Sequence, residues 1–277
     1  MRIRIGGTHF PLETLGPGRR LGVWFQGCPL ACAGCMSRHT WDAEGGRDAS
    51  VGELLGLWRD ALAQGAEGLT VSGGEPLEQA SGLAEFLAGA DAARGAAGRE
   101  PPADILVYTG YEQDEWDPDR LRALRHADAV IAGRFRIAEP TGLVWRGSAN
   151  QRLLPRTALG RARYEPHLHR RTTGPSVQVV VEQAVEPAVE PAAQRAVRTA
   201  LENADEPAGK PADGSTEALT EALTQAPTEA PTGTPAGAPG RPPAARLLGV
   251  PARGELAFYE RWLGERGLRL RERSWRP

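Results

Sequence analysis

Hydrophobic and polar residues alternate along the first two thirds of the chain with two periods, one typical of buried strands and the other of amphipathic helices. The apolar runs that predict strands lie at 20–25, 68–72, 105–108, 127–132 and 177–181. Helical spacing of apolar residues predicts helices at 51–62, with Ser50 as its N-cap, at 78–90 and at 112–125. Strands that alternate with helices of this length indicate an α/β fold built from parallel β/α units.

The stretch at 182–244 lacks both periods. It is rich in Pro and Ala, is acidic, and contains no aromatic residue. Such a segment buries too little apolar surface to offset roughly 1–2 kcal/mol of backbone entropy per residue. After it, a strand at 245–250 and an amphipathic helix at 256–263 are predicted. The sequence thus predicts three parts: a core at 1–181, a disordered linker at 182–244, and a strand and helix at 245–277 that dock back on the core.

Composition narrows the class of protein. The chain has 277 residues, of which 40% are hydrophobic and 25% charged, with a net charge of -2. Bulk charge therefore predicts neither nucleic acid nor an anionic membrane as a partner. No apolar run approaches the roughly 18–20 residues of a membrane span, and residues 1–6 lack the apolar core of a secretory signal. We expect a soluble, cytoplasmic protein.

Three cysteines lie together directly after the first predicted strand: Cys28, Cys32 and Cys35. An odd number so closely spaced does not suit a disulfide framework. A structural zinc site needs a fourth ligand, for which His39 is a candidate, and a redox pair leaves Cys28 unexplained. An iron–sulfur cubane held by three cysteines keeps one iron open to another ligand. The spacing favours this open cluster, with zinc and unrelated thiols as alternatives.

A second segment of interest, Ser72-Gly73-Gly74-Glu75-Pro76, ends the predicted strand at 68–72. Glycines at the carboxyl end of a β/α strand allow a ligand to approach the backbone, and Glu75 can accept a hydrogen bond from an ammonium group. Alone, this segment is more often a simple turn. After a three-cysteine loop in a β/α frame, it predicts a ligand site.

These segments together resemble the radical S-adenosylmethionine enzymes, and among them the small activases of glycyl radical enzymes such as anaerobic ribonucleotide reductase. The resemblance spans roughly residues 1–153. The segments that carry it follow one another in family order at 16–20, 25–35, 40–41, 72–77, 108–111, 132–135 and 145–152. The resemblance implies an incomplete barrel of five or six parallel β/α units, with the cofactors at the carboxyl-end rim.

The resemblance also implies roles for individual residues. Cys28, Cys32 and Cys35 would hold a [4Fe-4S] cluster, whose open iron is chelated by S-adenosylmethionine. The other residues expected to contact this cofactor are Ser37, which replaces an Asn of the activases, and Ser72, Gly73, Gly74, Glu75, Tyr108 and Thr109. No side chain is assigned as catalytic, because the cofactors supply the chemistry.

In such activases, one electron from a flavodoxin or ferredoxin cleaves S-adenosylmethionine to methionine and a 5'-deoxyadenosyl radical. That radical removes a hydrogen from the Cα of a glycine in a partner protein. Two alternatives stay open: radical chemistry on a small molecule or peptide, and a non-catalytic iron–sulfur or zinc module. The segment from Arg146 to Asn150 either caps a strand or contacts the substrate.

Overall fold

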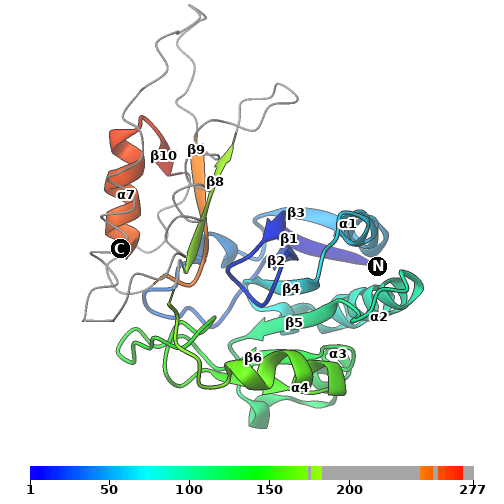
Figure 1. Cartoon of the computed structure of the whole chain (residues 1–277). Coiled ribbons are helices and arrows are strands. Elements are labelled where there is room, and N and C mark those ends of the chain that lie inside the picture. The colour runs from blue at the N-terminus through cyan, green and yellow to red at the C-terminus, as the bar shows by residue number, and fades with distance from the viewer. Residues whose placement is uncertain (174–175, 183–243, 252–254, 271–277) are drawn as a thin grey trace, which may run out of the picture. The chain divides into compact units, whose positions relative to one another are not determined.

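The computed structural model describes residues 1–173, 176–182, 244–251 and 255–270 (Figure 1). The predicted linker at 182–244 lies outside these residues, except for its two end positions. The described residues divide into two compact units, one ending at Arg171 and the other starting at Thr172.

The first unit is built on a seven-stranded mixed sheet with the order β3-β1-β2-β4-β5-β6-β7. Its strands are β1 (Arg2–Leu12), β2 (Arg20–Phe25), β3 (Arg47–Ser50), β4 (Gly68–Gly73), β5 (Asp104–Thr109), β6 (Ala129–Ala132) and β7 (Arg152–Pro155). Strands β2, β4, β5 and β6 are parallel, as predicted, whereas β1, β3 and β7 pair antiparallel with their neighbours.

The sheet has fewer parallel strands than the five or six expected. The predicted strand at 177–181 is present as β8 (Val177–Glu182), but its hydrogen-bonding partner is β9 (Ala244–Gly249), in the second unit. Its place at the edge of the large sheet is taken by β7, an antiparallel strand that the sequence analysis did not predict.

The helices of the first unit are α1 (Val51–Ala63), α2 (Ala80–Ala96), α3 (Pro118–Ala123) and α4 (Ala158–Tyr164), with 3-10 turns η1 (Arg38–Thr40), η2 (Pro76–Gln79), η3 (Gln113–Glu115) and η4 (Glu165–His167). The predicted cap is confirmed, because the Ser50 hydroxyl accepts from the Glu53 N–H at 3.0 Å. The single helix predicted at 112–125 is wrong. Trp116 is extended, and Asp117 caps a new helix whose first residue is Pro118.

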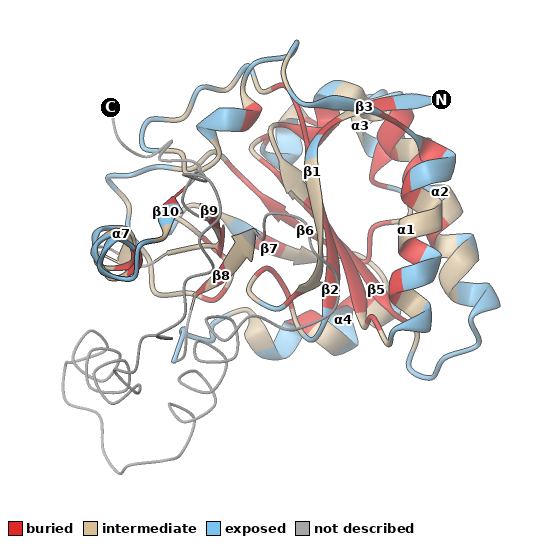
Figure 2. Cartoon of the chain, turned by 90° about the horizontal axis from the view of Figure 1, so that it is seen from above, coloured by how far each residue is buried: buried red, intermediate tan, exposed pale blue. Residues whose placement is uncertain are grey.

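The strands of the large sheet are largely buried (Figure 2), and its two faces pack against different clusters of side chains. Residues of one face pack against α1, α2 and α3, and they include Leu21, Val23, Phe25, Leu69, Val71, Ile105 and Val107. The alternating residues of the other face, Leu106, Ala129, Ile131 and Leu153, pack against Tyr164 of α4. This alternation determines which side chains of a strand end can meet.

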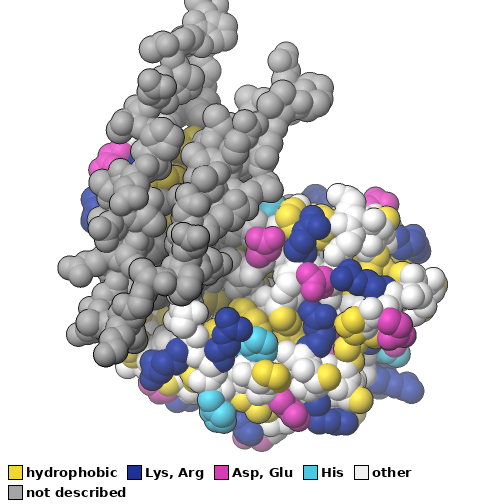
Figure 3. All heavy atoms as spheres, in the orientation of Figure 1, with side chains coloured by type: hydrophobic (Ala, Val, Ile, Leu, Met, Phe, Trp, Pro, Cys, Tyr) yellow, Lys and Arg dark blue, Asp and Glu magenta, His cyan; other side chains and the backbone are white. Residues whose placement is uncertain are grey.

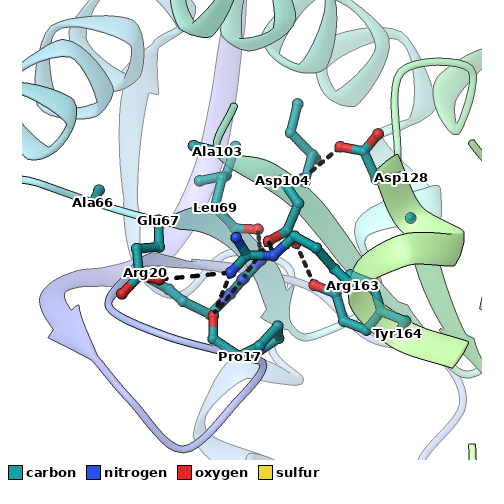
Figure 4. A network of polar contacts seen from close by, with 12 residues as sticks. Pro17, Arg20, Ala66, Glu67, Leu69, Ala103, Asp104, Asp128, Arg163 and Tyr164 are labelled. Atoms are coloured by element: carbon teal, nitrogen blue, oxygen red, sulfur yellow. Dashed lines mark hydrogen bonds and ion pairs between the residues drawn. The ribbon is translucent and has the colours of Figure 1, made fainter. Parts of the chain in front are cut away.

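At the amino ends of the parallel strands, the second face buries an ion pair (Figure 4). The guanidinium of Arg20 donates to both carboxylate oxygens of Asp104, at 3.0 and 2.8 Å, and both side chains are 0% exposed. Arg20 also donates to the hydroxyl of Thr70 at 2.6 Å. Asp104 further accepts from Tyr164 and pairs with Arg163 Nε at 2.9 Å. No pattern in the sequence indicates this network.

The described residues of the second unit include a three-stranded sheet with the order β10-β9-β8 and the helix α7 (Glu255–Glu265), which precedes the short β10 (Arg269–Leu270). Strand β9 and helix α7 confirm the elements predicted at 245–250 and 256–263. Tyr259 and Leu263 form the buried face of the helix. That this part docks on the core stays a prediction.

Cationic and anionic side chains of the first unit are interspersed on the face seen in Figure 3, in keeping with the net charge of -2. Within the described ranges, every helix is too short or too polar to cross a bilayer.

Candidate functional site

The candidate site lies at the carboxyl edge of the parallel strands, where the loops after β2, β4, β5 and β6 come together. The cysteine loop (residues 27–41) follows β2, and the Gly73–Glu75 turn follows β4. Thr109 ends β5 and is followed by Gly110. The tertiary structure therefore brings most of the predicted residues to one edge.

The cysteine loop leaves the sheet and returns to the same place. Its two limbs are joined where the N–H of Gly27 donates to the Thr40 carbonyl at 2.8 Å and that of Cys28 donates to the Trp41 carbonyl at 3.0 Å. At its tip, the N–H of Cys35 donates to the carbonyl of Cys32 at 3.1 Å, which forms a tight turn. All three thiols are half-buried and free of disulfides.

The Gly73–Glu75 turn lies directly against the start of the cysteine loop. The Gly74 N–H donates to the Phe25 carbonyl at 2.8 Å, and the Glu75 N–H donates to the Gly27 carbonyl at 2.9 Å. A Cβ at Gly74 would lie 2.4 Å from the Gly27 oxygen, and Gly73 has a φ of +107°. Both positions therefore need glycine to bring the two loops together.

Glu75 is held by the chain itself. It is 1% exposed, and its Oε1 accepts from the Thr109 hydroxyl at 2.8 Å and from the Leu77 N–H at 3.0 Å. Its Oε2 accepts from the Gly110 N–H at 2.7 Å. Burial raises the pKa of Glu75 to about 7 against the opposing effect of these hydrogen bonds. Glu75 thus joins the turn after β4 to the end of β5.

Known proteins match this part of the chain. A family model described as a 4Fe-4S single cluster domain matches residues 14–154. The anaerobic ribonucleoside-triphosphate reductase-activating protein of Enterobacteria phage T4 is 33% identical over 147 residues, which cover 51% of this chain and 87% of that protein. The chain belongs to this family of activating proteins with a single 4Fe-4S cluster domain.

Other members of the family match a similar share of this chain. The activating protein of Haemophilus influenzae is 34% identical over 152 residues, covering 52% of this chain and 92% of the relative. That of Escherichia coli K12 is 28% identical over 149 residues, covering 52% and 93%. The crystal structure of QueE from Escherichia coli superposes with a TM-score of 0.33 at 18% identity over 50% of this chain and 73% of QueE, a likeness too low to bear on the fold.

The three thiols suit the cluster named in the family description. Burial raises the pKa of the Cys28 thiol to about 11, and it also raises the pKa of Cys35. A metal must therefore displace the thiol protons when it binds. No three His, Cys, Asp or Glu side chains of the described residues converge closely enough to hold a single ion. A cubane imposes no such convergence, because its cysteine ligands bind different irons.

Ser37 contacts the cysteine loop through its backbone. Its N–H donates to the sulfur of Cys35 at 3.3 Å, and its carbonyl accepts from the Thr40 N–H at 2.9 Å and from the Thr40 hydroxyl at 2.7 Å. A backbone N–H is available from any residue except proline. This contact therefore does not depend on which of these side chains stands at position 37.

Tyr108 and Thr109 point to opposite faces of β5, as neighbours in a strand do. The Tyr108 hydroxyl donates to the Trp145 carbonyl at 3.1 Å, on the face that carries Tyr164. Only Thr109 reaches Glu75. Ser72 is half-buried in β4, opposite Trp24 of β2.

The segment from Arg146 to Asn150 makes hydrogen bonds to neighbouring loops, and its contact with a substrate stays a prediction. Arg146 is 6% exposed and donates to the carbonyls of His167 and Leu168 at 3.1 and 2.8 Å. Asn150 Nδ2 donates to the Arg134 carbonyl at 2.9 Å. The segment thereby holds the loop that follows β6.

Proposed function

We propose that this chain is a radical S-adenosylmethionine activase, which generates a glycyl radical on a partner enzyme such as anaerobic ribonucleotide reductase. In this proposal, Cys28, Cys32 and Cys35 hold a [4Fe-4S] cluster. The observation that carries the proposal is the junction of the cysteine loop with the Gly73–Glu75 turn through two main-chain hydrogen bonds. The junction sets a glycine-lined backbone beside a loop of three free thiols, which suits a ligand that must contact both.

A [4Fe-4S] cluster held by these thiols would supply the electron that cleaves S-adenosylmethionine to methionine and a 5'-deoxyadenosyl radical, and that radical would take the Cα hydrogen of the partner's glycine. The residues of the chain itself bind and orient the cofactors. Gly73 and Gly74 let their turn lie against the start of the cysteine loop, beside which the methionine end would bind, and Glu75 keeps the turn against β5 through Thr109. The Ser37 N–H stabilises negative charge on the Cys35 sulfur.

The relatives support the choice of partner, because those with 33% and 34% identity are activating proteins of anaerobic ribonucleoside-triphosphate reductases. We extend the proposal to three finer points: a large sheet that curves as an incomplete β/α barrel, a flavodoxin or ferredoxin as the reductant, and a cytoplasmic site of action.

The test is anaerobic reconstitution with iron and sulfide, followed by dithionite and S-adenosylmethionine, with 5'-deoxyadenosine measured by chromatography. We expect product from the wild type and none from Cys32→Ala, with circular dichroism showing that the variant is folded. Absence of product from a wild type that carries a full cluster would contradict the proposal.

The partner is tested separately. Incubation of the loaded wild type with an anaerobic ribonucleotide reductase should produce a glycyl radical signal in electron paramagnetic resonance (EPR) spectra. Formation of 5'-deoxyadenosine without that signal would instead favour the alternative target, a small molecule or peptide.

A further inference from the structure

Gln26 spans the neck of the cysteine loop. It follows the last residue of β2 and is 3% exposed. Its Nε2 donates to the carbonyls of His39 and Asp42, at 3.2 and 2.7 Å; His39 lies on the limb by which the loop returns to the sheet, and Asp42 directly follows the loop. Its main-chain N–H donates to the Arg4 carbonyl at 2.9 Å. One side chain therefore fixes the returning limb to the end of a buried strand.

The surroundings of Gln26 leave room for this amide and little else. A Cβ at Gly45 would lie 2.6 Å from its Nε2, and one at Gly46 would lie 3.0 Å from its Oε1. A Cβ at Gly6 of β1 would lie 3.1 Å from the same oxygen. Three glycines from two segments thus form a narrow slot around one polar side chain.

A second amide, Gln79, holds the backbone of Gln26. Its Oε1 accepts from the Arg4 N–H at 2.8 Å, and its Nε2 donates to the carbonyls of Arg4 and Gln26 at 2.8 and 3.0 Å. Gln79 ends η2, the 3-10 turn that follows Glu75. Gln26 is therefore fixed from the side of the Gly73–Glu75 turn and in turn fixes the cysteine loop.

We infer that Gln26 is a positioning residue, which holds the cysteine loop in its ligand-binding form and so determines how firmly the loop retains a cluster. The inference rests on the proposed function, in which the three cysteines are the cluster ligands. Both acceptors of Gln26 are backbone carbonyls, so no substitution at His39 or Asp42 can remove them. The role therefore depends on the two N–H groups that Gln26 supplies.

The test compares Gln26→Glu with the wild type after anaerobic reconstitution. The Glu side chain has the same shape as that of Gln but lacks its two N–H donors. We expect iron to be released to a chelator about tenfold faster, the change that the loss of one to two ordinary hydrogen bonds produces. The EPR spectrum of the reduced cluster should also change. The matched control is Gln64→Glu, at an exposed amide whose Nε2 donates to the Asp60 carbonyl, and it should behave as the wild type.

A second variant, Gly45→Ala, keeps Gln26 but sets a methyl group against its Nε2. It should also accelerate iron release. If Gln26→Glu does not fold, this variant alone tests the role of Gln26. In the metal-free chains, alkylation of the three cysteines should be faster in both variants. Iron release, EPR spectra and alkylation all unchanged from the wild type would overturn the inference. A wild type that binds no iron contradicts the proposed function, and the alkylation rates then still test the loop.

Discussion

Thr109 donates its hydroxyl to the carboxylate of Glu75 at 2.8 Å, which ties the end of β5 to the turn after β4. Glu75 lies in the turn after β4, Thr109 ends the neighbouring parallel strand β5, and the two are 34 positions apart in the sequence. Glu75 is buried, so its oxygens depend on the chain for their hydrogen bonds. The position of the Gly73–Glu75 turn therefore depends on the side chain of Thr109 in β5.

Replacing Thr109 with Val should therefore destabilise the chain. The variant keeps the shape of the side chain but removes a donor to Glu75 and an acceptor for the Tyr111 N–H. We expect the free energy of unfolding to fall by about 1–3 kcal/mol, measured with urea. Thr109→Ser keeps the hydroxyl, so its free energy of unfolding should fall by much less. Equal stability of the Val variant and the wild type would show that the bond contributes nothing.

The stability of the metal-free chain should depend on pH through Glu75. Burial raises the pKa of Glu75 from 4.5 to about 7, so the folded state binds this proton more tightly than the unfolded state. The contribution is fully present below pH 4.5 and is lost as the pH rises to about 7, a change of about 3 kcal/mol. Glu75→Gln should lack this part of the pH dependence in urea unfolding. Parallel profiles for the two chains would contradict the prediction.

Asp104→Asn should be strongly destabilising. The variant leaves the buried guanidinium of Arg20 without its counter-charge and weakens the contacts to Arg163 and Tyr164. Breaking one side of a buried ion pair costs about 3–5 kcal/mol. Arg20→Lys should also destabilise, because an ammonium group cannot bind both carboxylate oxygens in the same planar geometry. Thermal and urea unfolding check both variants, and a change below about 1 kcal/mol in Asp104→Asn would refute the prediction.

Gly74→Ala should separate the two loops of the candidate site. The added methyl group would lie 2.4 Å from the Gly27 carbonyl oxygen, so the turn must move away from the cysteine loop. We expect the rate of S-adenosylmethionine cleavage to fall by at least about tenfold, as small misplacements at reacting sites do. Gly56→Ala, within α1 and with no atom near the added group, is the control. It should stabilise the helix by about 0.5–1 kcal/mol and leave cleavage unchanged. Equal cleavage rates in the two variants would argue against the predicted contact.

The sequence by itself determined the features that depend on neighbouring residues. The parallel strands β2, β4, β5 and β6 were predicted because each is a buried apolar run, and the Ser50 cap because capping acts within one helical turn. The spacing of the three cysteines and the Gly73–Gly74 pair likewise indicated a site, since both are local arrangements. The order of these strands along the chain placed that site at one edge of the sheet.

Only the tertiary structure decided which distant residues meet. Strand β1 has few periodic apolar positions and is held by its pairing with β2 and β3, and β8 joins β9 although 61 residues lie between them in the sequence. Arg20 and Asp104 lie 84 positions apart, and Glu75, after β4, meets Thr109 at the end of the adjacent strand β5, 34 positions away. Such hydrogen bonds and ion pairs leave no periodic trace in the sequence, because their energy depends on burial and geometry that arise only when the sheet has formed.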